Sequence, residues 1–126
     1  MPRLKMPLTE EDIREVITHH EARNRELLSL VRERGADVKQ PRKIDVFFWS
    51  PDEQKVHALS RDIVRRGIKD VSHEPPTEGT DLWSIQGHIA VTPELAASSG
   101  FAEELSRLAA RHGSLFDGWG TEIDED

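Results

Sequence analysis

The chain has 126 residues, no cysteine and 33% charged residues. This length fits one domain, and the absence of cysteine excludes disulfides, thiol catalysis and cysteine-ligated metal centres. A chain without cysteine is expected to be cytoplasmic. The longest apolar run, residues 46–49, is far too short to span a membrane, and the first residues lack the apolar stretch of a secretory signal.

The formal net charge of −7 is unevenly distributed along the chain. Residues 1–43 carry +2 and residues 44–69 carry +1, whereas residues 70–126 hold 12 acidic against 2 basic side chains, a net charge of −10. An acidic surface repels phosphate backbones and attracts basic partners. The charge therefore argues against nucleic-acid binding and predicts an acidic docking surface in the second half of the chain.

Residues 9–34 are predicted to form a long helix. Thr9 and Asp12 have the spacing of a capping box at its start. Apolar residues recur at helical spacing along one side, with a polar gap at His20 and Asn24. Because this side is only weakly apolar, we expect the helix to pack along the domain rather than inside it.

The clearest predicted strand covers residues 43–49, which are rich in β-branched and aromatic side chains. Alternate residues from Ile44 share one face, and Phe47 and Trp49 lie on the other. A strand that is apolar on both faces is usually central and covered on both sides. Phe47 and Trp49 are therefore candidate contacts for the N-terminal helix.

The elements after this strand follow in the order helix, strand, strand, helix, strand. Ser50 is expected to cap the first of these helices, with Pro51 at its first position. The predicted bounds are residues 50–67 for the helix, 68–73 and 81–91 for two strands, 92–113 for a helical stretch with a break near residues 98–100, and 115–123 for the last strand.

This order predicts an α+β fold of the ferredoxin-like type, a βαββαβ sandwich with a four-stranded antiparallel sheet and an extra N-terminal helix. In the usual order of its strands, fourth-first-third-second, the strands at 43–49 and 81–91 are central. We expect a flexible N-terminus over residues 1–8, a helix and linker over 9–42, and the ferredoxin-like unit over 43–126, which together make a single domain.

The residues offer no positive case for an enzyme or a metal site. The six histidines include no His-x-x-x-His pair. Ser84 and His88 lie about 13 Å apart along a strand, beyond hydrogen-bond reach. The chain also lacks a glycine-rich phosphate loop and a Gly-x-Ser-x-Gly elbow. We therefore expect a non-enzymatic protein with no catalytic residue, no metal and no cofactor.

The same strand order occurs in RNA-recognition motifs, which stack bases on aromatic residues of the two central strands. The predicted strand at residues 81–91 lacks their aromatic signature, and it lies in the acidic half of the chain. We therefore expect no direct binding of nucleic acid by the sheet.

The most unusual segment is Phe-Asp-Gly-Trp-Gly-Thr at residues 116–121. Two glycines around a tryptophan allow the backbone to bulge or turn sharply at the edge of the sheet. Two roles for Trp119 stay open, and they do not exclude each other. Its ring closes the end of the core, or it anchors a partner on an edge strand beside acidic residues.

Asp117-Gly118-Trp119-Gly120-Thr121 resembles the terminal motif of the bacterial ribonuclease E inhibitor family, regulator of ribonuclease activity B. The resemblance covers residues 9–123. Its supporting features are a strand that runs into Trp49-Ser-Pro-Asp-Glu, a helix that ends in Arg-Arg-Gly67, and Ala109-Ala-Arg-His-Gly before the motif.

The resemblance implies a variation of the ferredoxin-like fold with an added N-terminal helix. It also implies a non-enzymatic role, in which the protein binds an endoribonuclease of the ribonuclease E type and lowers its activity by protein contact rather than by competing for RNA. Asp117, Gly118, Trp119 and Gly120 match the motif and are the partner-binding residues that the resemblance implies. The best-known members have a long acidic C-terminal tail, whereas this sequence has only three acidic residues at its end.

A second hypothesis belongs to a different class. Ferredoxin-like domains also sense small molecules or dimerise through sheet faces or edges, without a ribonuclease as target. This alternative is supported by the architecture alone.

Overall fold

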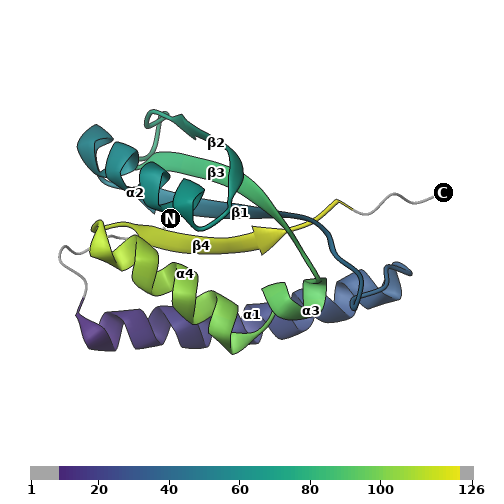
Figure 1. Cartoon of the computed structure of the whole chain (residues 1–126). Helices are drawn as coiled ribbons and strands as arrows, with labels where there is room; N and C mark the ends of the chain where they lie inside the picture. Colours follow the sequence, from purple (N-terminus) through teal and green to yellow (C-terminus); the bar gives the residue numbers. More distant parts are fainter. Residues whose placement is uncertain (1–8, 123–126) are drawn as a thin grey trace.

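The computed structural model describes residues 9–122, and the expected flexible segment 1–8 lies outside them, as do the last four residues. Figure 1 shows the described elements in chain order. They are α1 (Glu10–Glu33), β1 (Arg42–Ser50), α2 (Glu53–Arg65), β2 (Lys69–Glu74), β3 (Trp83–Val91), α3 (Pro93–Ala96), α4 (Ser99–Arg111) and β4 (Leu115–Gly120).

The four strands form one antiparallel sheet in the order β2-β3-β1-β4. β1 and β3 are therefore central, as predicted, and β2 and β4 form the two edges. With α1 added at the start, the chain has the predicted α+β ferredoxin-like fold. β2 and β3 begin one and two residues later than predicted, and β4 ends at Gly120.

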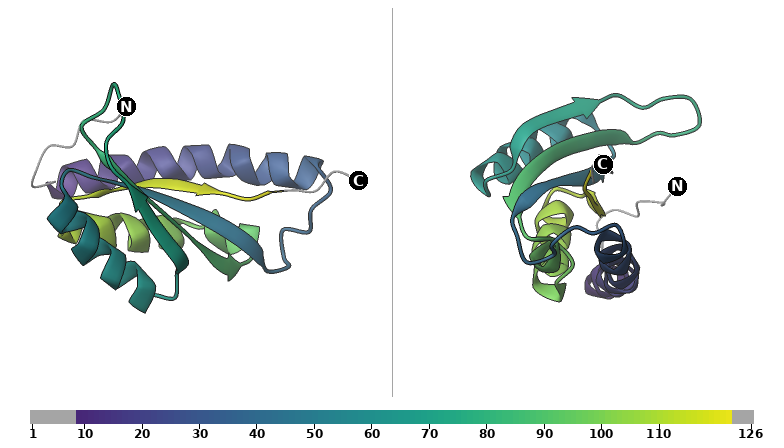
Figure 2. Two further views of the ribbon diagram at one scale, coloured as in Figure 1. Left: turned by 90° about the horizontal axis from the view of Figure 1, so that it is seen from above. Right: turned by 90° about the vertical axis from the view of Figure 1, so that its right-hand side faces the viewer.

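The core lies between one face of the sheet and the helices, as the views in Figure 2 show. Ile44, Val46 and Phe48 alternate along β1 and are buried on this face. α2 packs on β1, β2 and β3, whereas α4 packs on β4 and α2. α1 runs beside α4, and its Val31 belongs to the same buried cluster.

The prediction that Phe47 and Trp49 lie beneath the N-terminal helix is wrong. Both side chains are half-buried and lie on the sheet face opposite to the core. α1 instead packs beside α4, because its buried His20 and Asn24 bond to β4. The prediction that β1 is central is confirmed, whereas the prediction that both of its faces are covered is wrong.

The prediction that Ser50 caps α2 is also wrong. Ser50 is the last residue of β1, and its buried side chain accepts a hydrogen bond from the Ser114 hydroxyl at 2.8 Å. The cap is Asp52, whose carboxylate accepts a hydrogen bond from the Lys55 amide at 2.9 Å. Asp is among the best capping residues, and Ser50 is already engaged in the core.

Helix starts elsewhere follow the local sequence signals. Thr9 and Asp12 form the predicted capping box of α1, with hydrogen bonds of 3.0 and 3.1 Å. Thr92 caps α3 and Ser98 caps α4, which confirms the predicted break in this helical stretch.

Gly87 allows β2 to approach β3 closely. It lies opposite Val46 in the centre of the sheet. A Cβ atom at this position would lie 2.5 Å from Cγ2 of Ile68 and 3.1 Å from the carbonyl oxygen of Lys69. The Ile68 side chain and the start of β2 therefore occupy the space that a side chain at this position would need.

We expect Gly87→Ala to lower the free energy of unfolding by about 1–3 kcal/mol, because the new methyl group must displace Ile68 and the neighbouring backbone. Urea denaturation followed by circular dichroism measures this loss. Gly100→Ala is the matched control, since a Cβ atom there meets nothing within 4 Å and the position lies in the first turn of α4. Equal losses in the two variants would contradict the packing argument.

Candidate functional site

The Asp-Gly-Trp-Gly motif forms the end of the edge strand β4, and it contains the predicted bulge. Phe48 pairs with Phe116 and Phe47 pairs with Gly118, so Asp117 is the extra residue. Gly118 has a φ of +126°, a conformation that side chains other than glycine's rarely adopt. The glycine therefore sets the shape of the bulge.

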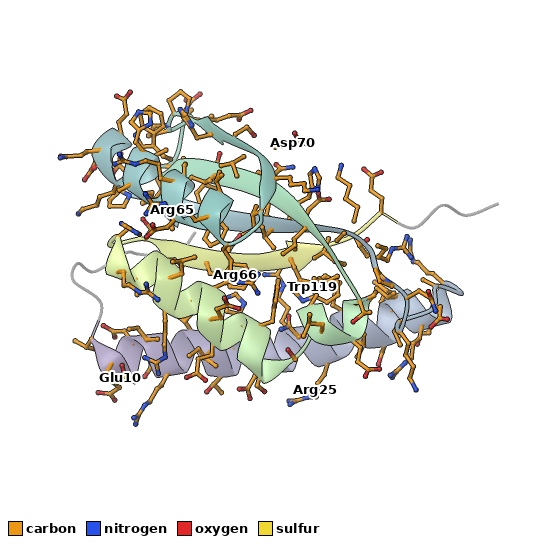
Figure 3. The ribbon with its side chains drawn as sticks, in the orientation of Figure 1. Glu10, Arg25, Arg65, Arg66, Asp70 and Trp119 are labelled. Carbon is orange, nitrogen blue, oxygen red and sulfur yellow. The ribbon has the colours of Figure 1, made fainter. Side chains whose placement is uncertain are left out.

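The ring of Trp119 lies in the core, below β4 in Figure 3. Trp119 is only 3% exposed and lies opposite Val46 of β1. Its indole N–H donates a hydrogen bond of 3.0 Å to Oδ1 of Asn24, which is itself buried. A buried tryptophan needs such a partner for its one polar group. The prediction that Trp119 closes the core is confirmed.

Two side chains of α1 bond to backbone carbonyls at the bulge. Nε2 of His20 lies 2.7 Å from the carbonyl oxygen of Phe116, and Arg23 donates to that of Asp117 at 3.0 Å. The His20 ring also lies against the Phe116 ring, with centroids 5.0 Å apart. α1 therefore covers this part of the β4 edge, which would otherwise present unpaired backbone groups.

Burial lowers the pKa of His20, against the opposing effect of its hydrogen bond to the Phe116 carbonyl oxygen, and the neighbouring His19 and Arg23 lower it further. His20 is 3% exposed, and its Nδ1 has no hydrogen-bond partner among the described residues. The neutral ring with its proton on Nε2 fits these contacts, because a carbonyl oxygen can only accept. The described geometry thus favours an uncharged His20.

The four predicted partner-binding residues differ in accessibility. Asp117 and Gly120 are half-buried, whereas Gly118 and Trp119 are buried. The motif therefore offers a partner the Asp117 carboxylate and the backbone at Gly120, but not the tryptophan ring. Whether these residues contact a partner stays a prediction.

The charges around the motif are mixed rather than purely acidic. Arg42 donates to Oγ1 of Thr121 at 3.1 Å and to the carbonyl oxygen of Glu122 at 2.5 Å. Arg66, the residue that caps the end of α2, forms an ion pair with Glu104 of α4. The fold thus brings Arg66, from the first half of the chain, next to Glu104, from the second half, so part of the acidity counted along the sequence is paired in the structure.

Two observations concern other classes of site within residues 9–122. In this part of the chain, no three His, Asp or Glu side chains come together as a metal site would require. No helix here combines the length and the apolar character needed to cross a membrane.

The family described as regulator of ribonuclease activity B matches residues 21–121. This range contains every strand of the sheet and the complete Asp-Gly-Trp-Gly motif. The chain belongs to this family. No curated protein matches the chain. Membership in the regulator of ribonuclease activity B family confirms the resemblance that the motif carries, and it supports a role as a regulator of ribonuclease activity.

Sequence reasoning missed the part that His20 and Asn24 play at the motif. The available signal was the polar gap in an otherwise apolar side of α1. Two buried polar side chains on one helix face require partners, because an unpaired buried polar group is costly. Their partners lie more than 90 residues further along the chain, which a local pattern does not identify.

We expect Trp119→Phe and Asn24→Ala each to lower the free energy of unfolding by about 1–3 kcal/mol, because each leaves a buried polar group unpaired. In the double variant, the loss of free energy of unfolding should be about 1 kcal/mol smaller than the sum of the two single losses, since both changes remove the same hydrogen bond. Urea denaturation of the four proteins measures this coupling.

The matched control for this cycle is Trp83→Phe. Trp83 is half-buried, and its indole N–H has no hydrogen bond within the described part of the chain. Combined with Asn24→Ala, it should give additive losses. Additive losses for Trp119→Phe and Asn24→Ala would show that the hydrogen bond between them does not contribute to stability.

We expect the melting temperature to fall as the pH is lowered from about 7.5 to 5.5. The pKa of His20 is lower in the folded than in the unfolded chain. Below the usual histidine pKa of about 6.5, the unfolded chain therefore binds a proton that the folded chain does not. The contribution of His20 to the free energy of unfolding is therefore complete above this pH, and it decreases as the pH is lowered toward the folded-state pKa. His20→Gln keeps a hydrogen-bond donor that does not titrate, so it should reduce the pH dependence of the melting temperature. The matched control, His19→Gln at the exposed neighbouring position, should largely keep this pH dependence.

Proposed function

We propose that this chain binds an endoribonuclease of the ribonuclease E type and lowers its activity without being an enzyme itself. The observation that carries the proposal is the family match over residues 21–121, which includes the motif. A role by protein contact needs no cofactor and no direct contact with RNA. From the sequence, we place this role in the cytoplasm.

We propose that Asp117, Gly118, Trp119 and Gly120 form the partner-binding site. The hydrogen bonds between α1 and β4 hold the bulge in one shape, which favours recognition of a preformed surface. Asp117 and Gly120 would touch the partner, because they are the accessible members. Gly118 and Trp119 would act by fixing the backbone that the partner meets.

A dimerising domain is the alternative, and one observation favours it. Phe47 and Trp49 are half-buried on the sheet face that the described helices leave open. Apolar side chains on an open sheet face are suited to pairing with a second sheet. Light scattering separates the two hypotheses, since a stable dimer that binds no ribonuclease would support the alternative.

The direct test is co-purification with a ribonuclease E-type enzyme, followed by RNA cleavage with and without the chain. The proposal predicts a complex and slower cleavage at every RNA concentration, because inhibition acts through the enzyme and not through the RNA. Inhibition that disappears when RNA is in excess would instead indicate competition for RNA.

We expect Asp117→Lys to weaken binding to the ribonuclease about tenfold or more while the melting temperature stays nearly unchanged, because it reverses a charge at the proposed contact. Surface plasmon resonance measures the affinity. Glu78→Lys is the matched control: it makes the same change of charge in the exposed β2–β3 connection, distant from β4 in the sheet. Equal weakening by both variants would indicate an effect of net charge rather than a contact at the motif.

A further inference from the structure

A groove of about 660 Å³ lies between α2 and β2, at the sheet edge opposite to β4. Neither the motif nor any other residue of the proposed site contributes to it. The lining residues that matter for the argument are His57, Arg61, Val64, Arg65, Val71 and His73.

The floor of the groove is apolar. Val64 on α2 is 56% exposed, although the other aliphatic residues of this helix, Val56, Leu59 and Ile63, are buried. Val71 of β2 is half-buried beside it and packs against the core. An exposed valine next to a second one offers a place for an apolar side chain of a partner.

The rim of the groove is basic. Arg61 and Arg65 are four residues apart on α2 and therefore lie on the same side of the helix. Arg61 has no ion-pair partner within residues 9–122, and the Arg65 side chain is 79% exposed, with one long contact of 3.5 Å to Asp62. In a chain with a net charge of −7, these two guanidinium groups form a local site for acidic groups.

The wall between α2 and β2 is held together by ring contacts. His57 of α2 meets His73 of β2 edge to face, with centroids 5.4 Å apart. His73 in turn lies 5.9 Å from the Trp83 ring. These contacts fix the distance between helix and strand, so the groove is formed before any partner binds.

The strand that borders the groove is an open edge of the sheet. An edge strand presents unpaired N–H and C=O groups at alternate residues, and an extended segment can add to it as a further strand. No described side chain bonds to the backbone of residues 71–74, in contrast to the β4 carbonyls that α1 occupies.

We propose that this groove binds an extended acidic segment of a protein, which pairs with β2 and places an apolar side chain over Val64 and Val71. Its carboxylates would meet Arg61 and Arg65. The apolar floor and the free strand edge fit a polypeptide better than RNA, which offers neither a strand backbone nor aliphatic side chains. The proposal is independent of the ribonuclease and of the site on β4.

The test uses the full chain and a fluorescent octapeptide, Asp-Thr-Leu-Ser-Glu-Thr-Val-Ser, whose acidic and apolar side chains share one face when the peptide is extended. We expect it to bind at least tenfold more tightly than the same peptide with lysine at every acidic position, and binding should weaken as salt is added. Amide shifts in nuclear magnetic resonance spectra should be largest in β2 and α2. Shifts confined to other elements would overturn the proposal.

Variants of the groove provide the second arm. Arg61→Glu combined with Arg65→Glu should reduce peptide affinity tenfold or more without changing the melting temperature, because both side chains are exposed. Arg25→Glu is the matched control, since Arg25 is an exposed arginine of α1 that lies far from Arg65 in Figure 3. Tighter binding of a labelled ten-residue uridine oligonucleotide that depends on the same arginines would overturn the proposal in favour of RNA. Self-association that the double variant abolishes would overturn it in favour of a second copy of the chain.

Discussion

One buried hydrogen bond, from the indole N–H of Trp119 to Asn24, joins the last strand to the first helix. α1 lies outside the βαββαβ plan, so its position has to come from contacts of this kind. The tryptophan can be buried only with a partner for its N–H, and the asparagine only with a partner for its oxygen. Each side chain therefore makes the burial of the other favourable, and α1 is held beside β4 rather than across the open face of the sheet.

The two edges of the sheet differ because of where α1 lies. At β4, His20 and Arg23 bond to carbonyls of the bulge, so the edge is closed at the point where Gly118 turns the chain. At β2, the backbone borders a groove that Arg61 and Arg65 flank. A partner at β4 therefore meets a rigid bulge, whereas a partner at β2 meets an open strand. The two proposed surfaces would therefore differ in how a partner recognises them, and this difference follows from the placement of one helix.

Much of the fold could be predicted because the deciding signals are local. The capping residues Thr9, Thr92 and Ser98 act on amides within three residues, and their helices begin as predicted. The face of β1 that a helix covers is not a local property. Phe47 and Trp49 are apolar enough to be covered, but the helix that could cover them is held elsewhere by contacts across more than 90 residues. The same limit applies to charge, because counting by segment places Glu104 in an acidic block while the fold pairs it with Arg66.

The burial of Trp119 changes how the motif can be recognised. A ring that is 3% exposed offers almost no contact area to a partner, so in the proposed site Trp119 would act through the shape of its strand. That shape depends on Asn24 and on the positive φ of Gly118, neither of which needs to touch the partner. In the proposed site, residues of α1 that stabilise the bulge and residues of β4 that face the solvent would therefore act together. The match to the regulator of ribonuclease activity B family covers residues 21–121 and so includes both Asn24 and the motif.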